Sequence, residues 1–470
     1  MAPTILLISQ AFPPEAVVGA LRAGNVARAF RDAGYRVLVV TAALEGEVEG
    51  EREWLPGVQV KTVALGPRYR DRLTAFLRKW QTTAPRADSP QHVPSTPASS
   101  VPVGRLRSLV LSLVWIPDDE LRFVLPAYRT ARRLLKGVDL VYTTAPSHST
   151  NLVGLLLGRL HRVRWCAEFR DPWCYPQSSP VTPLVARVNR WLERLCINAA
   201  DDLVTVAEQT ANLYRQRLGA AAGKVIVVRN GIPALNHRHA HESGAPFRIV
   251  YSGNIYGGRD PRAFLQAVRA VASEYESAGQ PLRVDLFVNE RWVGDRSLES
   301  YVRDLGLAAI AHIREWIPHA EMQRILAQSD LLLLLAQRQP LQVPNKLYEY
   351  LGTGVPILAV TDAEGETARM LHDVGGHYVV ERDTCDDIAA ALRSALMASV
   401  SGGVAHSASR DLLEEWLTER QMQQLVAAVG PHKAIRSASP PSDSVTRLSV
   451  PGDMPPADRL PKERLPYSQT

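Results

Sequence analysis

The sequence predicts an α/β protein made of two doubly wound, Rossmann-like domains in tandem. Short apolar runs rich in Val, Ile and Leu alternate with stretches of helical periodicity, which is typical of parallel βαβ units. This alternation occurs twice, on either side of a polar stretch at 236–245. A chain of 470 residues with 46% hydrophobic content is also too long for one compact core. We therefore predict an N-terminal domain at 1–235 and a C-terminal domain at 246–428.

The predicted elements follow one another closely in both domains. In the first domain we expect strands at 5–9, 37–41, 58–63, 140–142, 165–169, 203–206 and 225–228, with helices at about 20–33, 151–160 and 183–199. In the second domain the alternation continues through 247–252, a helix at 261–278, and then 283–287, 298–305, 310–315, 321–328, 331–335, 346–352, 357–360, 365–372 and 378–380. The leucine run at 331–335 is typical of a strand buried on both faces.

Two stretches lack any such period. Residues 82–104 are rich in Pro, Ser, Thr and Ala, and residues 429–470 combine Pro, Ser and charge, so we predict a disordered insert and a disordered tail. Basic residues surround the apolar run in 105–117. That segment fits either peripheral contact with an anionic membrane or a helix packed on the flank of the sheet.

Charge and cysteine content narrow the class of protein. The formal charge of +6 is spread along the chain, which favours anionic ligands or an anionic membrane surface over nucleic acid. The four cysteines have neither metal-ligand spacing nor the density of a disulfide scaffold, which favours a reducing compartment. No leader is recognisable, and no apolar run reaches the roughly 20 residues that span a bilayer. We expect a cytoplasmic protein, with the inner face of the membrane as a candidate contact.

The most informative segment runs from Val343 to Pro356. Lys346 and Glu349 lie near a predicted helix start, after the strand at 331–335, and open α/β sheets bind ligands at the carboxyl ends of their strands. Glu349 can accept hydrogen bonds from two vicinal hydroxyls, while Lys346 and the helix N-terminus can meet phosphate. These groups suit a ribose and its diphosphate. An ordinary i,i+3 ion pair between Lys346 and Glu349 is the alternative.

Polar or small residues follow other predicted strands as well. Gly19 comes after the first strand, where a small residue allows a close approach to phosphate or sugar. His148 and the pair Arg170 and Asp171 follow two later strands, and a carboxylate there could act as a base or orienting group toward a ligand. The alternatives are a glycine that only relieves strain, a structural histidine, and an Arg170–Asp171 pair that closes its loop.

In the second domain, a glycine-containing loop joins the strand at 247–252 to its helix. Asn254 offers neutral hydrogen bonds in this loop, and Arg259 can neutralise phosphate with a bidentate fork. The alternative for Arg259 is a solvated loop charge.

Taken in order, these motifs resemble the retaining glycosyltransferases of family 4. The resemblance covers about residues 4 to 425 and rests on six segments: 11–15 with 19–22, 144–149, 168–173, 229–231, 251–254 and 343–356. It implies a GT-B fold, two Rossmann-like domains facing across a cleft. The implied catalytic residues are Asp171, His148 and Arg170, and the implied donor-binding residues are Gly19, Asn254, Arg259, Lys346, Leu347 and Glu349.

The chain departs from the family pattern at three positions. Arg170 stands where many members carry a histidine, Asn254 where they carry an arginine, and Leu341 where they carry the first of two glutamates. One branch of the family shares a Val-Pro-Ser-Lys-Leu-Tyr-Glu-Tyr form of the last motif, so the loss at Leu341 is compatible with activity.

The resemblance implies a retaining glycosyltransferase that moves a sugar from a nucleotide-sugar donor to a glycan or polyprenyl-linked acceptor, in surface polysaccharide or glycoconjugate synthesis. No cofactor is expected beyond the nucleotide-sugar co-substrate. We also expect no metal, because the Asp-Asp pairs at 118–119, 201–202 and 386–387 fall near predicted helix ends, where capping explains them. The alternative is an inactive GT-B accessory protein that binds nucleotide sugars. A nicotinamide-dependent dehydrogenase is disfavoured, because no Gly-x-Gly-x-x-Gly follows the first strand of either domain.

Overall fold

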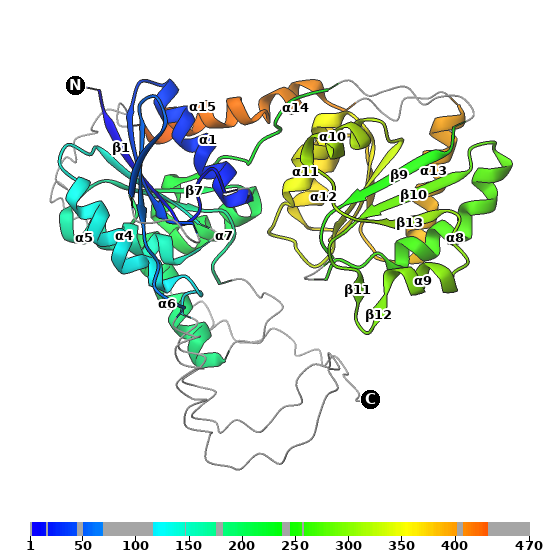
Figure 1. The fold of residues 1–470 in the computed structure, drawn as a ribbon, viewed down its shortest axis with the longest axis horizontal. Helices are drawn as coiled ribbons and strands as arrows, with labels where there is room; N and C mark the ends of the chain where they lie inside the picture. The colour runs from blue at the N-terminus through cyan, green and yellow to red at the C-terminus, as the bar shows by residue number, and fades with distance from the viewer. Residues whose placement is uncertain are drawn as a thin grey trace, which may run out of the picture. The chain divides into compact units, whose positions relative to one another are not determined.

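The computed structural model describes residues 2–15, 17–44, 50–68, 116–145, 147–174, 182–236, 245–255, 258–401 and 408–430. Within them the chain forms two large sheets with helices on both faces of each (Figure 1). The predicted insert at 82–104, the apolar run of the basic segment and the predicted tail beyond residue 430 lie outside the described residues.

The N-terminal sheet has eight strands in the order β3-β4-β2-β1-β5-β6-β7-β8. Their bounds are β1 Thr4–Ser9, β2 Arg36–Ala42, β3 Gly50–Leu55, β4 Val58–Val63, β5 Leu140–Thr144, β6 Trp165–Phe169, β7 Asp202–Thr205 and β8 Val225–Val227. All pair in parallel except β3, which runs antiparallel to β4 at the edge. The helices are α1 Val18–Asp32, α4 Leu121–Leu134, α5 Ser149–His161, α6 Pro183–Ala199 and α7 Glu208–Leu218, followed by the 3-10 turn η1 Gly219–Lys224.

Alternate residues of β1 point into two separate cores, as the two-residue period of a strand requires. Leu6 and Ile8 belong to a cluster that α4, α5 and α6 cover, whereas Ile5 and Leu7 belong to a cluster that α1 covers. The last described helix, α15 (Thr418–Val429), packs in this second cluster through Met422, Leu425 and Val429. Residues 418–428 lie within the predicted C-terminal domain at 246–428, but they pack against the N-terminal sheet.

The C-terminal sheet has six parallel strands in the order β13-β10-β9-β14-β15-β16. The strand bounds are β9 Phe247–Ser252, β10 Leu282–Phe287, β13 Ala311–Arg314, β14 Leu331–Ala336, β15 Ile357–Thr361 and β16 Tyr378–Val380, and a small hairpin joins β11 Trp292–Val293 to β12 Arg296–Ser297. The helices are α8 Arg262–Ser277, α9 Leu298–Asp304, α10 His319–Ala327, α11 Asn345–Thr353, α12 Glu366–Val374, α13 Cys385–Val400 and α14 Arg410–Glu415. The predicted leucine strand is β14, and all six of its residues are buried.

Some elements were not predicted. Strand β3 has a charged, largely exposed sequence without apolar alternation, because it is an antiparallel edge. Helix α4 contains Pro126 and four arginines, which obscure its apolar stripe. Helices α7, α13, α14 and α15 were also left out of the predicted alternation.

The segment between the two sheets is held by backbone pairing with the chain just before α15. The N–H of Ile232 donates to the carbonyl of Trp416 at 2.7 Å, and the N–H of Thr418 donates to the carbonyl of Ile232 at 2.9 Å. Gly231 has φ of +87°, and a Cβ there would lie 2.5 Å from the Cα of Thr418. Only glycine fits this position, which explains the Arg229-Asn230-Gly231 motif.

Each sheet changes winding direction next to its first strand. In the N-terminal sheet β1 lies between β2 and β5, and in the C-terminal sheet β9 lies between β10 and β14. In each sheet, the connections that leave the first strand therefore run toward opposite edges of that sheet. This opens a crevice at the carboxyl end of β1 in the first sheet and of β9 in the second. The loops after β1, β5, β9 and β14 are the expected places for ligands.

Candidate functional site

The loops after β5 and β6 bring together the predicted catalytic residues of the N-terminal half. The two strands pair in parallel with Thr144 opposite Glu168, so their loops leave the same edge. His148 lies directly before α5, and its ring stacks on the Trp173 ring, with centroids 4.8 Å apart and planes 4° from parallel. Trp173 belongs to the same loop as Arg170 and Asp171.

His148 is a neutral imidazole with an available ring nitrogen. Its Nδ1 is buried and has no hydrogen-bond partner in the described structure. Burial lowers the pKa of His148 to about 4, although the nearby Asp118 carboxylate works in the opposite direction. A neutral imidazole can donate or accept one hydrogen bond at each nitrogen, so His148 is suited to a sugar hydroxyl.

Asp118 positions the His148 loop, and the sequence analysis missed this role. Its carboxylate accepts hydrogen bonds from the Ser149 N–H at 3.0 Å and the Ser149 hydroxyl at 2.6 Å, with a longer one from the Ser147 hydroxyl. It therefore caps the N-terminus of α5, whose own N-cap residue His148 makes no capping bond. We predicted that the 118–119 pair caps a nearby helix end. Asp118 does cap a helix, but it is α5, whose first residue, Ser149, lies 31 positions further along the chain.

A buried ion pair lies beneath the β6 loop. Arg22 of α1 donates to Glu168 of β6 through Nε at 3.0 Å and Nη2 at 2.7 Å, and the Thr144 hydroxyl donates to the same carboxylate. Burial alone would raise the pKa of Glu168, but Arg22 holds it below its ordinary value. Arg22 also donates to the carbonyls of Val228 and Arg229. These groups are fully engaged with one another, so we assign them to holding the loop and the start of the connecting segment.

Arg170 and Asp171 occupy an unusual electrostatic environment. Arg170 is 9% exposed, its Nε and Nη1 have no hydrogen-bond partner in the described structure, and burial lowers its pKa. Burial raises the pKa of Asp171, while the Arg170 charge and a hydrogen bond with the Gln342 side chain act against that rise. No ion pair joins the two side chains within the described residues, which argues against the alternative of a simple loop-closing pair. A poorly neutralised guanidinium beside a carboxyl of raised pKa is typical of a functional site.

Gly19 lies in the first turn of α1, after the loop that follows β1, and its predicted donor contact stays a prediction. The glycine is buried, and α1 begins with no side-chain capping bond and no acidic residue in its first turn. No side chain at the start of α1 therefore accepts hydrogen bonds from the first N–H groups of this helix. These N–H groups lie in the connection that follows the carboxyl end of β1.

In the C-terminal half, hydrogen bonds join the loops after β9 and β14. Arg259 donates through Nη2 to the Gln339 side chain at 3.1 Å, and the Gln337 side chain donates to the carbonyl of Asp260 at 2.9 Å. Asp362, after β15, accepts the N–H of Gln339 at 2.7 Å. These contacts place Arg259 at the switch point of the sheet.

Asn254 and helix α11 lie at the same switch point. The side-chain oxygen of Asn254 is buried without a partner in the described structure. The Tyr350 hydroxyl accepts the N–H of Ser252 at 3.0 Å, which ties α11 to the end of β9. Helix α11 begins at Asn345 with no side-chain capping bond and no acid in its first turn, so its N-terminus can accept an anion.

Lys346 and Glu349 form the ion pair that the sequence analysis gave as the alternative interpretation. The Lys346 Nζ lies 2.9 Å from Glu349 Oε2, and weaker hydrogen bonds from Asn345 and Gln323 reach the same carboxylate. The side chains stay 25% and 12% exposed, respectively. A carboxylate offers about four acceptor positions and an ammonium three donors, so the pair orients both groups and leaves capacity for a ligand.

Leu347 anchors α11 in the core. Its side chain is fully buried in the core of the C-terminal half, and its N–H donates to the carbonyl of Pro344 at 2.9 Å. Its predicted donor contact stays a prediction, and the buried side chain takes no direct part in it.

Hydrogen bonds also link strand-end loops of the two halves. The buried carboxylate of Glu366, in the first turn of α12, accepts the N–H groups of Glu208 and Gln209 at 3.1 Å each. The Thr210 hydroxyl donates to the carbonyl of Leu341 at 3.1 Å. Glu366 thus caps α7 from the other half of the chain, a role that the sequence gave no signal for.

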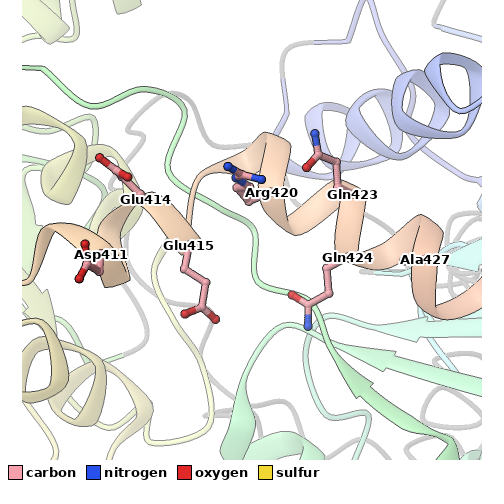
Figure 2. Close-up of a pocket in the computed structure, with 7 residues that line it drawn as sticks. All are labelled: Asp411, Glu414, Glu415, Arg420, Gln423, Gln424 and Ala427. Atoms are coloured by element: carbon pink, nitrogen blue, oxygen red, sulfur yellow. The ribbon is translucent and has the colours of Figure 1, made fainter.

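The hollow drawn in Figure 2 is a different surface feature. It is formed by α14 and α15 and lined by Asp411, Glu414, Glu415, Arg420, Gln423, Gln424 and Ala427. None of these residues follows a sheet strand at its carboxyl end, and none is a predicted site residue, so we do not connect this hollow with catalysis.

The described ranges contain no group of three or more His, Cys, Asp or Glu residues arranged to hold a metal ion. The four cysteines are free thiols. No described helix combines the length and the apolar character needed to cross a membrane.

Two family models match the chain in the order expected from its two sheets. Residues 19–231 match the model described as a glycosyl transferase 4-like domain, and residues 259–427 match one described as glycosyl transferase-like. Apart from its first strand, β1 or β9, each of the two sheets thus falls within a stretch that matches a glycosyl transferase-like model.

Known proteins agree with this assignment. Spore coat protein SA of Bacillus subtilis is 21% identical over 207 residues, which cover 40% of this chain and 52% of that protein, so the match spans about half its length. Among solved structures, sucrose-phosphate synthase of Thermosynechococcus elongatus superposes with a TM-score of 0.60 at 15% identity, covering 90% of this chain and 98% of the other. Anabaena HepE, solved in complex with UDP and glucose, gives 0.58 at 14% identity with the same coverages. These likenesses show the GT-B fold.

Proposed function

We propose that this protein is a retaining glycosyltransferase that transfers a sugar from a nucleotide-sugar donor to a glycan or lipid-linked acceptor. The observation that carries the proposal is the location of the polar groups. Cationic and carboxylate side chains gather at the switch point of the C-terminal sheet, and an imidazole, a guanidinium and a carboxyl gather at the ends of β5 and β6.

The C-terminal half would hold the donor. Glu349, oriented by Lys346, accepts hydrogen bonds from the two ribose hydroxyls. Arg259, Lys346 and the uncapped N-terminus of α11 meet the diphosphate, and their positive charge stabilises the leaving nucleoside diphosphate as its own charge grows. The solved neighbour HepE is a complex with UDP-glucose, which supports a donor of this class.

The N-terminal half would hold the acceptor and the reacting sugar. Asp171 accepts or orients the proton of the acceptor hydroxyl, and its raised pKa makes it a better base than an exposed aspartate. Neutral His148 binds a hydroxyl through a ring nitrogen, and the N–H groups of Arg170 bind negative charge on the ligand. In a retaining transfer without a protein nucleophile, the acceptor oxygen attacks from the face that the diphosphate leaves. We propose that these steps need no metal.

A donor screen tests this proposal. A ligand that binds only the folded state raises the melting temperature, so the protein is heated with UDP-, GDP- and dTDP-sugars in turn. The donor that raises it is then supplied in radiolabelled form, with and without EDTA, and release of free sugar is followed. Hydrolysis that persists in EDTA supports the enzyme, and the absence of any thermal shift across the panel would contradict the assignment.

The accessory-protein alternative has one observation in its favour. The first of the two glutamates that many family members have is replaced by Leu341, and the carboxylate of Glu349, the second, is paired with Lys346. Tight donor binding without hydrolysis or transfer in the same assay would favour this alternative.

A further inference from the structure

Helices α4, α5 and α6 form one continuous side of the N-terminal half. Phe123 of α4, Val153 of α5 and Cys196 of α6 belong to the same core cluster as Leu6 and Ile8 of β1. The three helices therefore cover the same face of the sheet, and α5 packs against both α4 and α6. All three are labelled in the N-terminal half of Figure 1. We call their outward surface the arginine face.

The arginine face carries a one-sided charge. Four arginines lie in α4, one in α5 and three in α6, against a single acid, Glu193. The Glu193 side chain is 1% exposed and is already paired with Arg217. Apart from Arg122, which pairs with Glu120, these arginines are exposed and make no ion pair within the described residues. Such a surface attracts a polyanion.

Large apolar side chains project among these arginines. Leu125 of α4 is 50% exposed, Leu160 of α5 63%, and Leu184 and Trp191 of α6 41% and 58%. On α6 the spacing of Leu184, Arg187 and Trp191 places them on one side of the helix. Arginines mixed with exposed tryptophan and leucine are typical of a surface that lies in the head-group region of an anionic bilayer.

We propose that the arginine face docks the protein on an anionic lipid membrane. Its arginines contact lipid head groups, and Trp191 with the exposed leucines enters the interface below them. Contact with nucleic acid phosphates would use the arginines but would leave these apolar side chains in water, so the bilayer is the better match.

Docking through this face also places the candidate site beside the lipid. In parallel βαβ units, helices start where the preceding strands end, so α5 and α6 begin at the edge that carries His148 and Asp171. Asp118, which holds the α5 N-terminus, lies just before α4. An acceptor anchored in the membrane would then present its hydroxyl at this edge.

Co-sedimentation with vesicles tests the proposal on the full chain without any donor. We expect binding to vesicles that contain phosphatidylglycerol, little binding to vesicles of phosphatidylcholine alone, and weaker binding as NaCl is raised. Trp191→Ser should weaken binding about tenfold, from the interfacial burial of an aromatic side chain. Trp292, in the C-terminal half, is also 58% exposed, and Trp292→Ser is the matched control that should bind as the parent does.

A charge variant separates the bilayer from other polyanions. Arg190→Gln with Arg194→Gln should weaken vesicle binding roughly 30-fold, since each arginine near an anionic surface contributes about a fivefold factor. Arg269→Gln with Arg303→Gln, on exposed positions of α8 and α9, should leave it unchanged. Three results would overturn the proposal. The first is no binding to anionic vesicles, and the second is an equal loss of binding in the two arginine pairs. The third is that Trp191→Ser leaves the vesicle affinity unchanged while a DNA oligomer binds as tightly as the vesicles do. Because no sugar transfer is measured, failure of the proposed enzyme activity would not affect this result.

Discussion

Replacing Glu349 by glutamine separates a donor-binding role from a structural one. The Lys346–Glu349 pair is partly exposed, and such pairs contribute about 0.2–1 kcal/mol to folding. Glu349→Gln should therefore lower the free energy of unfolding by about 1 kcal/mol or less. If the carboxylate accepts the ribose hydroxyls, the loss of charge-assisted hydrogen bonds should cost about 2 kcal/mol of donor binding, or roughly 30-fold in Kd.

Isothermal titration calorimetry with the nucleoside diphosphate found in the donor screen measures this loss. Thermal unfolding of the same samples measures stability. The matched control is Glu274→Gln, which breaks an exposed ion pair with Arg393 between α8 and α13, away from the strand ends. That variant should bind the nucleotide as the parent does. If Glu349→Gln kept the parent affinity, or if both variants lost affinity equally, the assignment of Glu349 to the ribose would be wrong.

Three further predictions concern ionisable groups inside the fold or partly covered by it. Glu168→Gln should cost about 3–5 kcal/mol in urea unfolding, because it leaves the Arg22 charge buried without its partner; a loss below 1 kcal/mol would show that water relaxes the site. Asp171→Asn should slow sugar transfer by about 10²–10⁴-fold, and an unchanged transfer rate would exclude a base role. The same change should raise the melting temperature at neutral pH. Because the pKa of Asp171 is raised in the folded state, its ionisation destabilises the fold as the pH rises, and asparagine does not ionise. Burial lowers the pKa of His377 to about 4, so acid favours the unfolded state as pH falls from 6.5 toward 4; His377→Asn should recover about 2 kcal/mol of stability at pH 5, and equal pH profiles for variant and parent would refute this.

Most of the fold was predictable because its core strands are locally distinctive. The apolar runs that became β1, β9 and β14 are buried on both faces, and such strands show in the sequence as continuous aliphatic segments. Strand β3 was not predictable, since an exposed edge needs no apolar pattern and its charges help to prevent edge pairing. The stretch that forms α15 was assigned to the C-terminal domain by its position in the chain, because a sequence does not show which sheet an apolar helix side covers.

The location of the candidate residues followed from strand order together with the motif resemblance. Loops after parallel strands leave one edge of each sheet, and the resemblance singled out His148 and Asp171 in the first sheet and Arg259 and Glu349 in the second. Their roles stay predictions. The sequence could not show that Asp118 reaches the start of α5, because that contact depends on how distant segments pack.

The sequence by itself determined the two βαβ series and the loops that carry polar groups, since both follow from local periodicity and turn chemistry. Only the tertiary structure decided that Arg22 neutralises Glu168 across 146 positions, that Glu366 caps α7 across 158, and that arginines from three helices share one surface. Local patterns depend on backbone geometry over a few residues. Long-range pairs depend on which side chains meet once the cores have packed, and no spacing in the sequence records that.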